Sequence, residues 1–203
     1  KLLQVLGMED MSTHLLFEAM KSHLDELDTK RLLQIVYKVD PSLKKPIFNL
    51  IAAKATQDMI PDLIARTAGR DHVARVQIIA ILAKFSAPEV QNTMEGLAQD
   101  TNRRVRVAAI EAMGKLRTPQ NIKLITSLLL DDQLEVQSKA ADLLIQLNDP
   151  DTCKYLVEVL RHDSEYTRRA AVEVLNAIAD PDSVKYLLTI LGDSDWWVRS
   201  RAC

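Results

Sequence analysis

The sequence predicts an all-α protein, an α-solenoid in which antiparallel helical hairpins of about 31 residues stack into a right-handed superhelix. Three observations support this prediction. The composition is 47% hydrophobic but only 4% aromatic, with 5 glycines in 203 residues, which favours helices over strands. Prolines recur at a constant interval, and the segments between them repeat one helical pattern of apolar residues.

The interval between the prolines is 31 residues, and it separates Pro88, Pro119, Pro150 and Pro181. Proline is favoured in the first turn of a helix, and an aspartate just before it can cap that helix. The segment 148–151 (Asn-Asp-Pro-Asp) therefore predicts a helix start. Apolar residues from Tyr155 to Leu160 then supply the buried side of this first helix. Each proline thus predicts the first helix of a hairpin.

The second helix of each hairpin has a clearer pattern. Its apolar residues lie at offsets 0, 4, 8 and 11, which share one side of an α-helix. One example is the set Val105, Ala109, Met113 and Leu116. The residue at offset 4 is alanine in three successive repeats, and its small side chain lets adjacent helices approach closely. Since a hairpin cannot cover its own apolar face, neighbouring hairpins must stack.

The pattern weakens before residue 70. Leu43, Ile47 and Ile51 follow the apolar stripe one period before the first regular repeat, but Pro61 lies four residues off the proline phase. Helices are expected over roughly 11–27, 29–39 and 43–55. We therefore divide the chain into residues 1–70, which are degenerate helical repeats or an N-terminal cap, and residues 71–203, which are regular repeats in one continuous solenoid. Because Cys203 falls within an expected helix, we expect a truncated piece of a longer protein.

These repeats resemble HEAT repeats of the short bacterial and archaeal type, which are also called PBS-lyase-like. The segment Val105–Gly114 carries the best match, and the resemblance extends over about residues 70–203. It implies an α-solenoid that holds a partner macromolecule. It implies little about the partner, because such repeats occur in scaffolds, kinase-associated proteins, lyases and assembly factors.

The resemblance also implies a structural ladder of charges. In the family, an acidic residue in the turn and an arginine early in the second helix connect neighbouring repeats. The pairs that fit are Asp100 with Arg106, Asp163 with Arg168, and Asp193 with Arg199. Asp131 is matched with Gln137, so the ladder is partly neutral there. We expect these arginines to set the geometry of the repeats rather than to bind a ligand.

Charge and cysteine content narrow the classes of function. The net charge is -2 and the pI is about 6.1, so neither nucleic acid nor an anionic membrane is an expected partner. The only cysteines, Cys153 and Cys203, lie far apart, which suits a reducing compartment. The sequence shows no signal peptide and no apolar run long enough to span a bilayer. We expect a cytoplasmic protein without membrane insertion.

Residues that could carry chemistry are sparse. The histidines are His14, His23, His72 and His162, and none has a spacing typical of metal ligands. Neither a glycine-rich phosphate loop nor a G-x-S-x-G elbow is present. Cys153 stands at a repeat position that is apolar in the neighbouring repeats, Ile122 and Val184, so it is expected in the core. We expect no enzymatic activity, no catalytic residue, no cofactor, no metal and no small-molecule ligand.

The solvent-facing side of the second helices is the expected binding surface, since it commonly lines the concave face of a solenoid. Its residues lie at offsets 3, 6 and 10. They are Gln77, Lys84, Glu111, Lys115, Lys139, Asp142, Gln146 and Glu173. Alternatively, Glu111 and Lys115 form only a solvated pair within one helix. Trp196 and Trp197, expected in the turn before the last helix, either pack on a neighbouring repeat or act as an anchor for a partner.

We therefore expect a non-enzymatic scaffold that binds a protein on its concave face and is a module of a larger protein. Two alternatives remain. One is a bilin-lyase-like enzyme subunit, which the family resemblance alone supports. The other is a nucleic-acid-binding HEAT protein that uses the local cluster of arginines, Arg103, Arg104, Arg106, Arg168 and Arg169.

Overall fold

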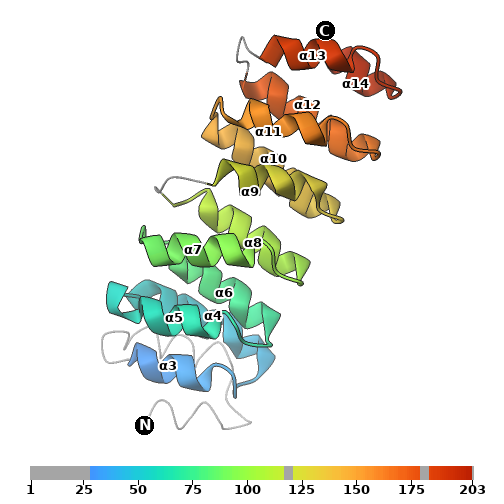
Figure 1. Ribbon diagram of the computed structural model, residues 1–203. Helices are drawn as coiled ribbons and strands as arrows, with labels where there is room; N and C mark the ends of the chain where they lie inside the picture. The colour runs from blue at the N-terminus through green and yellow to red at the C-terminus, as the bar shows by residue number, and fades with distance from the viewer. Residues whose placement is uncertain (1–27, 117–120, 179–182, 203) are drawn as a thin grey trace. The chain divides into compact units, whose positions relative to one another are not determined.

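Helices account for all the regular structure of the described residues (Figure 1). The computed structural model describes residues 28–116, 121–178 and 183–202. It divides into two units, with the boundary between Phe85 and Ser86. The all-α prediction is confirmed.

The first unit contains two of the helices that the weak early pattern predicted, over 29–39 and 43–55, and two further helices in its described part. They are α3 (Thr29–Ile35), α4 (Pro41–Lys54), α5 (Ile60–Arg66) and α6 (His72–Leu82), with a short 3-10 turn at Gln57–Met59 before α5. Helix α3 packs on α4, α5 packs on α6, and α4 packs on α6. Leu43, Ile47 and Ile51 are buried, as their phase predicts. The helix expected over 11–27 lies outside the described residues.

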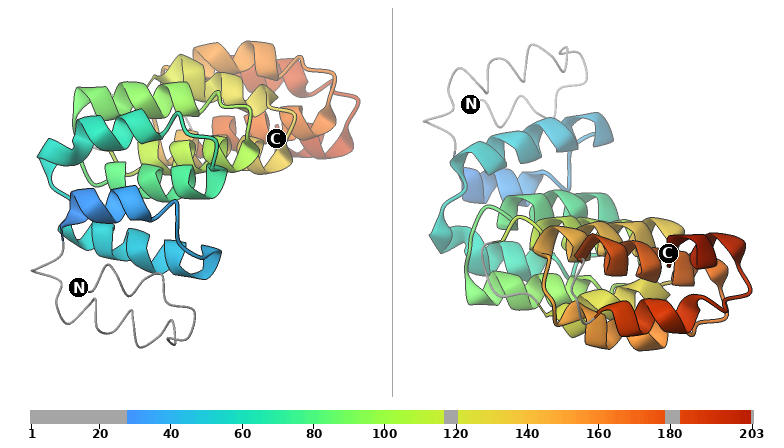
Figure 2. Two further views of the ribbon diagram at one scale, coloured as in Figure 1. Left: turned by 90° about the horizontal axis from the view of Figure 1, so that it is seen from below. Right: turned by 90° about the horizontal axis from the view of Figure 1, so that it is seen from above.

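The second unit consists of hairpins. Their first helices are α7 (Pro88–Leu97), α9 (Ile122–Ser127, extended by a 3-10 turn at Leu128–Leu130), α11 (Thr152–Val159) and α13 (Val184–Ile190). Their second helices are α8 (Arg103–Met113), α10 (Leu134–Leu147), α12 (Glu165–Ile178) and α14 (Trp196–Arg201). Consecutive second helices contact one another, and α9 contacts α11, so the hairpins of this unit stack in two layers (Figure 2).

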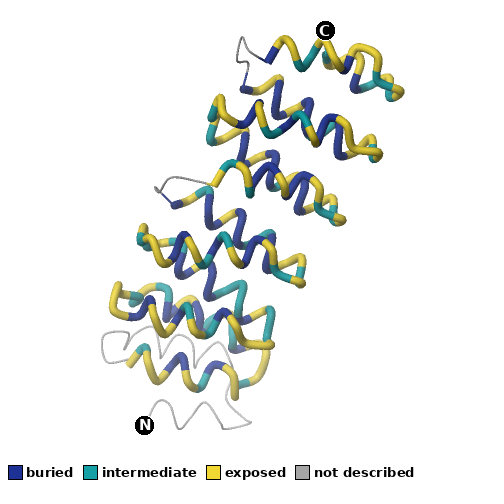
Figure 3. The backbone as a smooth tube through the Cα atoms, viewed as in Figure 1, coloured by how far each residue is buried: buried dark blue, intermediate teal, exposed yellow. Residues whose placement is uncertain are grey.

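Small residues allow the second helices to pack closely. Ala109, Ala140 and Ala171, at the predicted offset, are fully buried. Every helix of this unit also has an exposed side, so buried and exposed segments alternate along the chain (Figure 3). The stacking of helical hairpins predicted from the apolar pattern is therefore present.

The helix starts agree with the proline prediction where they are described. Pro88 is the first residue of α7. Helix α11 begins at Thr152, two residues after Pro150, and the Asp149 carboxylate accepts a hydrogen bond from the backbone N–H of Asp151 (2.9 Å). Asn148 ends α10 in the left-handed conformation (φ 48°), which asparagine tolerates. Pro119 and Pro181 lie outside the described residues.

Candidate protein-binding surface

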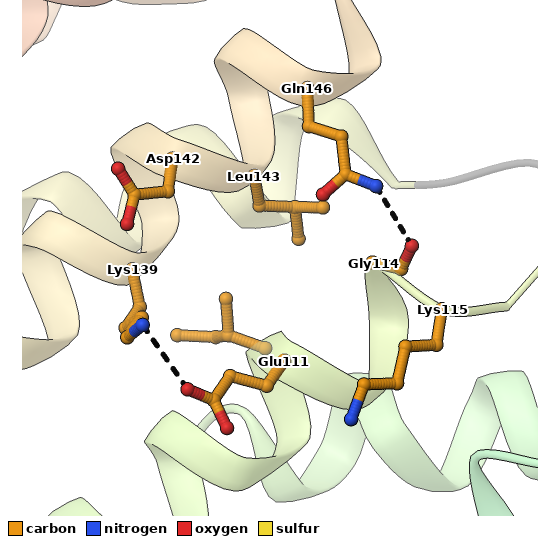
Figure 4. A pocket seen from close by; sticks show the side chains of 8 residues that line it. Glu111, Gly114, Lys115, Lys139, Asp142, Leu143 and Gln146 are labelled. Carbon is orange, nitrogen blue, oxygen red and sulfur yellow. Dashed lines mark hydrogen bonds and ion pairs between the residues drawn. The ribbon is translucent and has the colours of Figure 1, made fainter.

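A hollow of about 410 Å³ lies between α8 and α10, and five of the eight predicted surface residues line it (Figure 4). These five are Glu111, Lys115, Lys139, Asp142 and Gln146. They come together because α8 and α10 present the same register positions side by side, one repeat apart. Repeat stacking therefore creates a concave site from residues that are far apart in the sequence.

Two polar contacts between α8 and α10 frame the hollow. At one end, Lys139 Nζ pairs with Glu111 Oε1 (3.2 Å). At the other end, Gln146 Nε2 donates to the carbonyl oxygen of Gly114 (3.0 Å). Glu111 thus pairs with the next repeat, and no ion pair with Lys115, which follows the end of α8, is found among the described residues. The structure therefore does not form the alternative, an ion pair between Glu111 and Lys115.

The floor of the hollow is apolar and tight. Ile110 and Leu143, which are buried, lie between the two polar contacts. A Cβ atom at Gly114 would lie 3.3 Å from both Leu143 Cδ1 and Gln146 Oε1. Glycine at this position therefore lets the end of α8 approach α10 and leaves its carbonyl open to Gln146.

Three charged side chains of this surface have no ion-pair partner among the residues that the structure describes. Lys115 and Asp142 are exposed and lie on opposite sides of the hollow (Figure 4). Glu173 is exposed on α12, at the register position that Asp142 has on α10. Such charges remain hydrated and are able to pair with a ligand.

The remaining two predicted residues belong to the first unit. Gln77 and Lys84 are on or just after α6. The Lys84 ammonium donates to the carbonyl oxygen of Ala52 at the end of α4. Lys84 therefore makes a contact between second helices that resembles the one from Gln146 to Gly114.

Buried arginines clamp successive turns together. Arg106 Nη1 donates to the carbonyl oxygen of Asp100 (2.9 Å), and Nη2 pairs with the Asp131 carboxylate (2.7 Å) in the next repeat. Arg168 likewise donates to the carbonyl oxygens of His162 and Asp163 (both 2.9 Å). Its guanidinium holds the two Asp193 oxygens at 2.8 Å.

These contacts change the pairing expected for the ladder. Arg106 and Arg168 bind the backbone, not the carboxylate, of Asp100 and Asp163, because the arginine side chain folds back over its own turn. The carboxylate partner comes from the following turn. Arg199 makes the same contact with the backbone of its own turn, since its Nη1 donates to the carbonyl oxygen of Asp193 (2.6 Å).

At Gln137 the ladder lacks both the arginine and the carboxylate of the other steps. Gln137 replaces the arginine and donates to the carbonyl oxygen of Asp131 (2.6 Å). In the next turn, His162 stands where Asp131 and Asp193 stand in their own repeats, 31 residues away in each direction. Its Nδ1 accepts from the backbone N–H of Ser164 (3.2 Å), as Asp193 accepts from Asp195 (2.8 Å). Histidine therefore keeps the hydrogen bond of the turn but supplies no carboxylate for an arginine.

The two tryptophans begin α14 rather than lying in the preceding turn, because the Asp195 carboxylate caps the helix at the N–H groups of Trp197 and Val198 (3.1 and 3.0 Å). Arg169 also holds this carboxylate (3.1 and 2.6 Å), and this contact lowers the pKa of Asp195 to about 2. The guanidinium groups of Arg169 and Arg201 lie 5.9 and 5.3 Å from the centre of a Trp197 ring.

Trp196, by contrast, is 66% exposed. Leu134 has the same register position two repeats earlier and is 60% exposed. The exposure of Trp196 is therefore a property of this position in the repeat. Trp197 thus contacts Arg169 of the preceding hairpin, while Trp196 faces solvent.

Among the five arginines considered for nucleic-acid binding, three are already used within the protein. Arg106, Arg168 and Arg169 pair with carboxylates. Arg103 and Arg104 are exposed at the start of α8. Fewer arginines of this cluster are thus available to bind phosphate groups than the sequence alone indicates.

Other candidate sites are not assembled in the described residues. No group of three or more His, Cys, Asp or Glu side chains lies close enough there to hold a metal ion. Cys153 is buried, as its phase predicts, whereas His14 and His23 lie outside the described residues. In the same part of the chain, every helix is too short or too polar to cross a bilayer.

Comparisons with known proteins agree with this architecture. The chain matches the family model for HEAT repeats twice, at residues 60–136 and 131–203. The crystal structure of YibA from Escherichia coli is similar over 96% of this chain and 74% of its own, with 16% sequence identity and a TM-score of 0.57. An engineered protein is similar over 92% of this chain and 59% of its own, with 18% identity and a TM-score of 0.50.

At these identities the similarity shows a shared fold. No curated protein sequence matches the chain. The two matches to the family model span residues 60–203, which is well over half of the sequence. The stacked hairpins, the buried alanines and the arginine clamps lie largely within this range. The chain belongs to the HEAT-repeat family.

Proposed function

We propose that this chain is a non-enzymatic scaffold that binds a protein partner on the face formed by its second helices, with the hollow between α8 and α10 as a main contact. The observation that carries the proposal is the convergence of five predicted surface residues on one hollow. HEAT-repeat solenoids of this kind offer extended surfaces of successive helices to their partners.

The chemistry of the hollow supports a polypeptide ligand. An apolar floor between charges of both signs is typical of protein interfaces, in which an apolar centre is surrounded by a polar rim. Lys115 on one side favours an acidic group of the partner, while Asp142 and Glu173 favour basic groups. A segment that carries an apolar side chain between an acidic and a basic one would match all three features.

We also propose that the chain works as a module of a larger cytoplasmic protein. The support is its low cysteine content, with Cys153 buried in the core, together with a repeat architecture that commonly accompanies other domains.

The test is a triple charge reversal, Lys115→Glu, Asp142→Lys and Glu173→Lys. These residues are chosen because they make no ion pair in the described structure, so the reversal leaves the Lys139–Glu111 contact intact. The matched control reverses Lys123, Glu158 and Glu89, which are exposed on first helices and give the same change in net charge. Proteins captured from lysate by each variant would be compared by quantitative mass spectrometry.

We expect a defined set of proteins to be lost from the triple variant and kept by the control, with circular dichroism unchanged in both. Equal capture by all three forms would contradict the proposal. Loss in both variants would also contradict it, because the second-helix face would then have no special role.

A further inference from the structure

Three successive second helices of the second unit begin with an exposed large apolar side chain. Leu134, Tyr166 and Trp196 are 60%, 54% and 66% exposed at the starts of α10, α12 and α14. These helices contact one another in order, and the turns that precede them follow one another along one edge of the unit (Figure 1). This turn edge carries one apolar side chain per repeat, and none of the three lines the hollow between α8 and α10.

The stacking of repeats does not cover these side chains. Leu134 and Tyr166 stay more than half exposed although α12 and α14 pack against their helices, whereas the nearby Val136 and Thr167 are 0% and 1% exposed. Exposed apolar side chains that gather on one surface are typical of sites at which another protein binds, and Trp and Tyr are enriched among the residues that contribute most to binding.

One of the three side chains is also held in place. The guanidinium of Arg169 lies 5.6 Å from the centre of the Tyr166 ring, and Arg169 is itself bound to the Asp195 carboxylate (2.6 Å). A ring that is already positioned loses little conformational freedom when a partner binds. Tyr166 is therefore suited to be the central contact of the turn edge.

Carboxylates outnumber cations in the turns that carry these apolar side chains. Seven carboxylates lie within residues 131–135, 161–166 and 193–196, and four of them already pair with arginines of α8 and α12. The other three, all exposed and without an ion pair in the described structure, are Glu135, Asp163 and Glu165. The same turns contain one arginine, Arg161. The turn edge therefore favours a partner that carries lysine or arginine.

The preceding repeat limits the extent of this surface. Arg103 and Arg104 start α8 at the register positions of Leu134 and Glu135, and both are exposed. The turn before α8 thus replaces the apolar and the acidic residue by two cations, which would repel a basic partner. The surface begins at α10.

The spacing of the three apolar side chains favours a helix as the binding segment. Packed helices lie about 8–10 Å apart, so the anchors are separated by roughly that distance from one repeat to the next. In an α-helix, residues seven positions apart are separated by about 10 Å and lie on the same side. In a β-strand, residues three positions apart span a similar distance but point to opposite faces.

We infer that the turn edge formed by Leu134, Tyr166 and Trp196 docks a basic amphipathic helix of a protein partner, in which apolar residues recur at every seventh position. Lysines or arginines beside these apolar residues pair with the carboxylates of Glu135, Asp163 and Glu165. The inference goes beyond the proposed function, because it concerns a different surface and does not depend on the hollow.

The test uses a synthetic helical peptide with leucine at every seventh position and lysine on either side of each leucine. Its fluorescent label reports binding to the full chain by anisotropy, and a second peptide has glutamate in place of every lysine. One variant removes the apolar side chains of the turn edge by Leu134→Ser, Tyr166→Ser and Trp196→Ser. The matched control removes three exposed apolar side chains elsewhere, by Tyr37→Ser, Val73→Ser and Leu130→Ser.

We expect the wild type to bind the lysine peptide, with an affinity that falls as salt is added. Binding should be at least about tenfold weaker in the variant that lacks the three edge side chains and unchanged in the control. A third variant reverses the charge of the edge by Glu135→Lys, Asp163→Lys and Glu165→Lys. It tests the same surface without removing an apolar side chain, and it should prefer the glutamate peptide.

Four outcomes would overturn the inference. The first two are no binding of the lysine peptide by the wild type, and equal binding by the wild type and the variant that lacks the edge side chains. The third is a preference of the wild type for the glutamate peptide. The fourth is a dimer of the wild type in analytical ultracentrifugation that the same variant splits, because a second copy of the chain would then cover the turn edge.

Discussion

Each buried arginine clamp joins two turns through one side chain. Arg168 satisfies two carbonyl oxygens of its own turn and the Asp193 carboxylate of the next turn, and both charged groups are about nine-tenths buried. A buried pair of this kind contributes mainly through geometry, since desolvation offsets much of the attraction, while the loss of one partner is costly. The clamps therefore fix the offset between hairpins.

Gln137 and His162 allow this idea to be tested by a double-mutant cycle. Gln137→Arg alone should destabilise the protein by about 1–3 kcal/mol, because a nearly buried guanidinium then has no carboxylate at residue 162. His162→Asp alone should have a small effect. Together they should show a favourable coupling of about 0.5–3 kcal/mol, because the pair would reproduce Arg168 and Asp193.

The coupling is measured by urea unfolding of the four proteins of the cycle. Additive effects would mean that the clamp geometry does not transfer to this repeat. Asp163→Asn in the double variant serves as the control, since Asp163 is the other carboxylate of that turn.

Asp195 predicts a pH dependence of stability. Its folded-state pKa is about 2, below the ordinary value of 3.8, chiefly because the carboxylate accepts hydrogen bonds from Arg169. The carboxylate therefore stabilises the fold fully above pH 3.8, and this contribution is lost as the pH falls toward 2. Thermal unfolding midpoints should drop through this window in the wild type and drop less in Asp195→Asn.

A carbon-detected NMR titration of the Asp195 carboxyl provides the direct measurement. Arg169→Gln should move its pKa back toward the ordinary value. A midpoint near 3.8 in the wild type would show that the Arg169 contact does not persist in solution.

The second helices approach one another closely because their contact residues are small. Ala109, Ala140 and Ala171 are fully buried at equivalent positions of α8, α10 and α12. Ala140→Leu should destabilise the protein by about 1–3 kcal/mol, since the added atoms must push two helices apart. Ser138→Leu, at an exposed position of α10, should change the free energy of unfolding by less than about 0.5 kcal/mol.

Chemical denaturation monitored by circular dichroism measures both variants. A similar cost at residues 138 and 140 would contradict the packing argument. Tolerance of Ala140→Leu would mean that the spacing between α10 and its neighbours is looser than the buried alanines indicate.

The apolar periodicity predicted the helices because their burial pattern is local. A stripe at offsets 0, 4, 8 and 11 depends only on helical geometry, so α8, α10 and α12 were predictable from the sequence. The start of α14 was not, since it depends on whether the Asp195 carboxylate turns inward to cap the helix.

The same distinction applies to the candidate site. Sequence phase alone identified five of the eight residues that line the hollow, because equivalent positions of stacked helices come together. The partners of Glu111 and Arg106 could not be predicted in this way. Both residues pair with residues of the next repeat, so their partners depend on how far one hairpin is shifted relative to the next. The spacing of residues within one helix does not determine this shift.

Within residues 86–203, we expect the stacked hairpins to behave as a one-dimensional array, in which stability depends on contacts with nearest neighbours. Helix α10 contacts second helices on both sides, whereas α14 contacts one, α12. We therefore expect amide hydrogen exchange to be slowest in α10 and to become faster through α12 to α14. Exchange should also be fast in α13, where Val184 and Leu188 are more than half exposed.

Native-state exchange measured by mass spectrometry or NMR would resolve this gradient, and Ala140→Leu offers a way to shift it. Loosening α10 removes a neighbour from α12, so α12 and α14 should exchange faster although neither is mutated. If all four helices instead exchanged at one common rate, the hairpins of this unit would unfold as a single block, and the nearest-neighbour description of its stability would have to be abandoned.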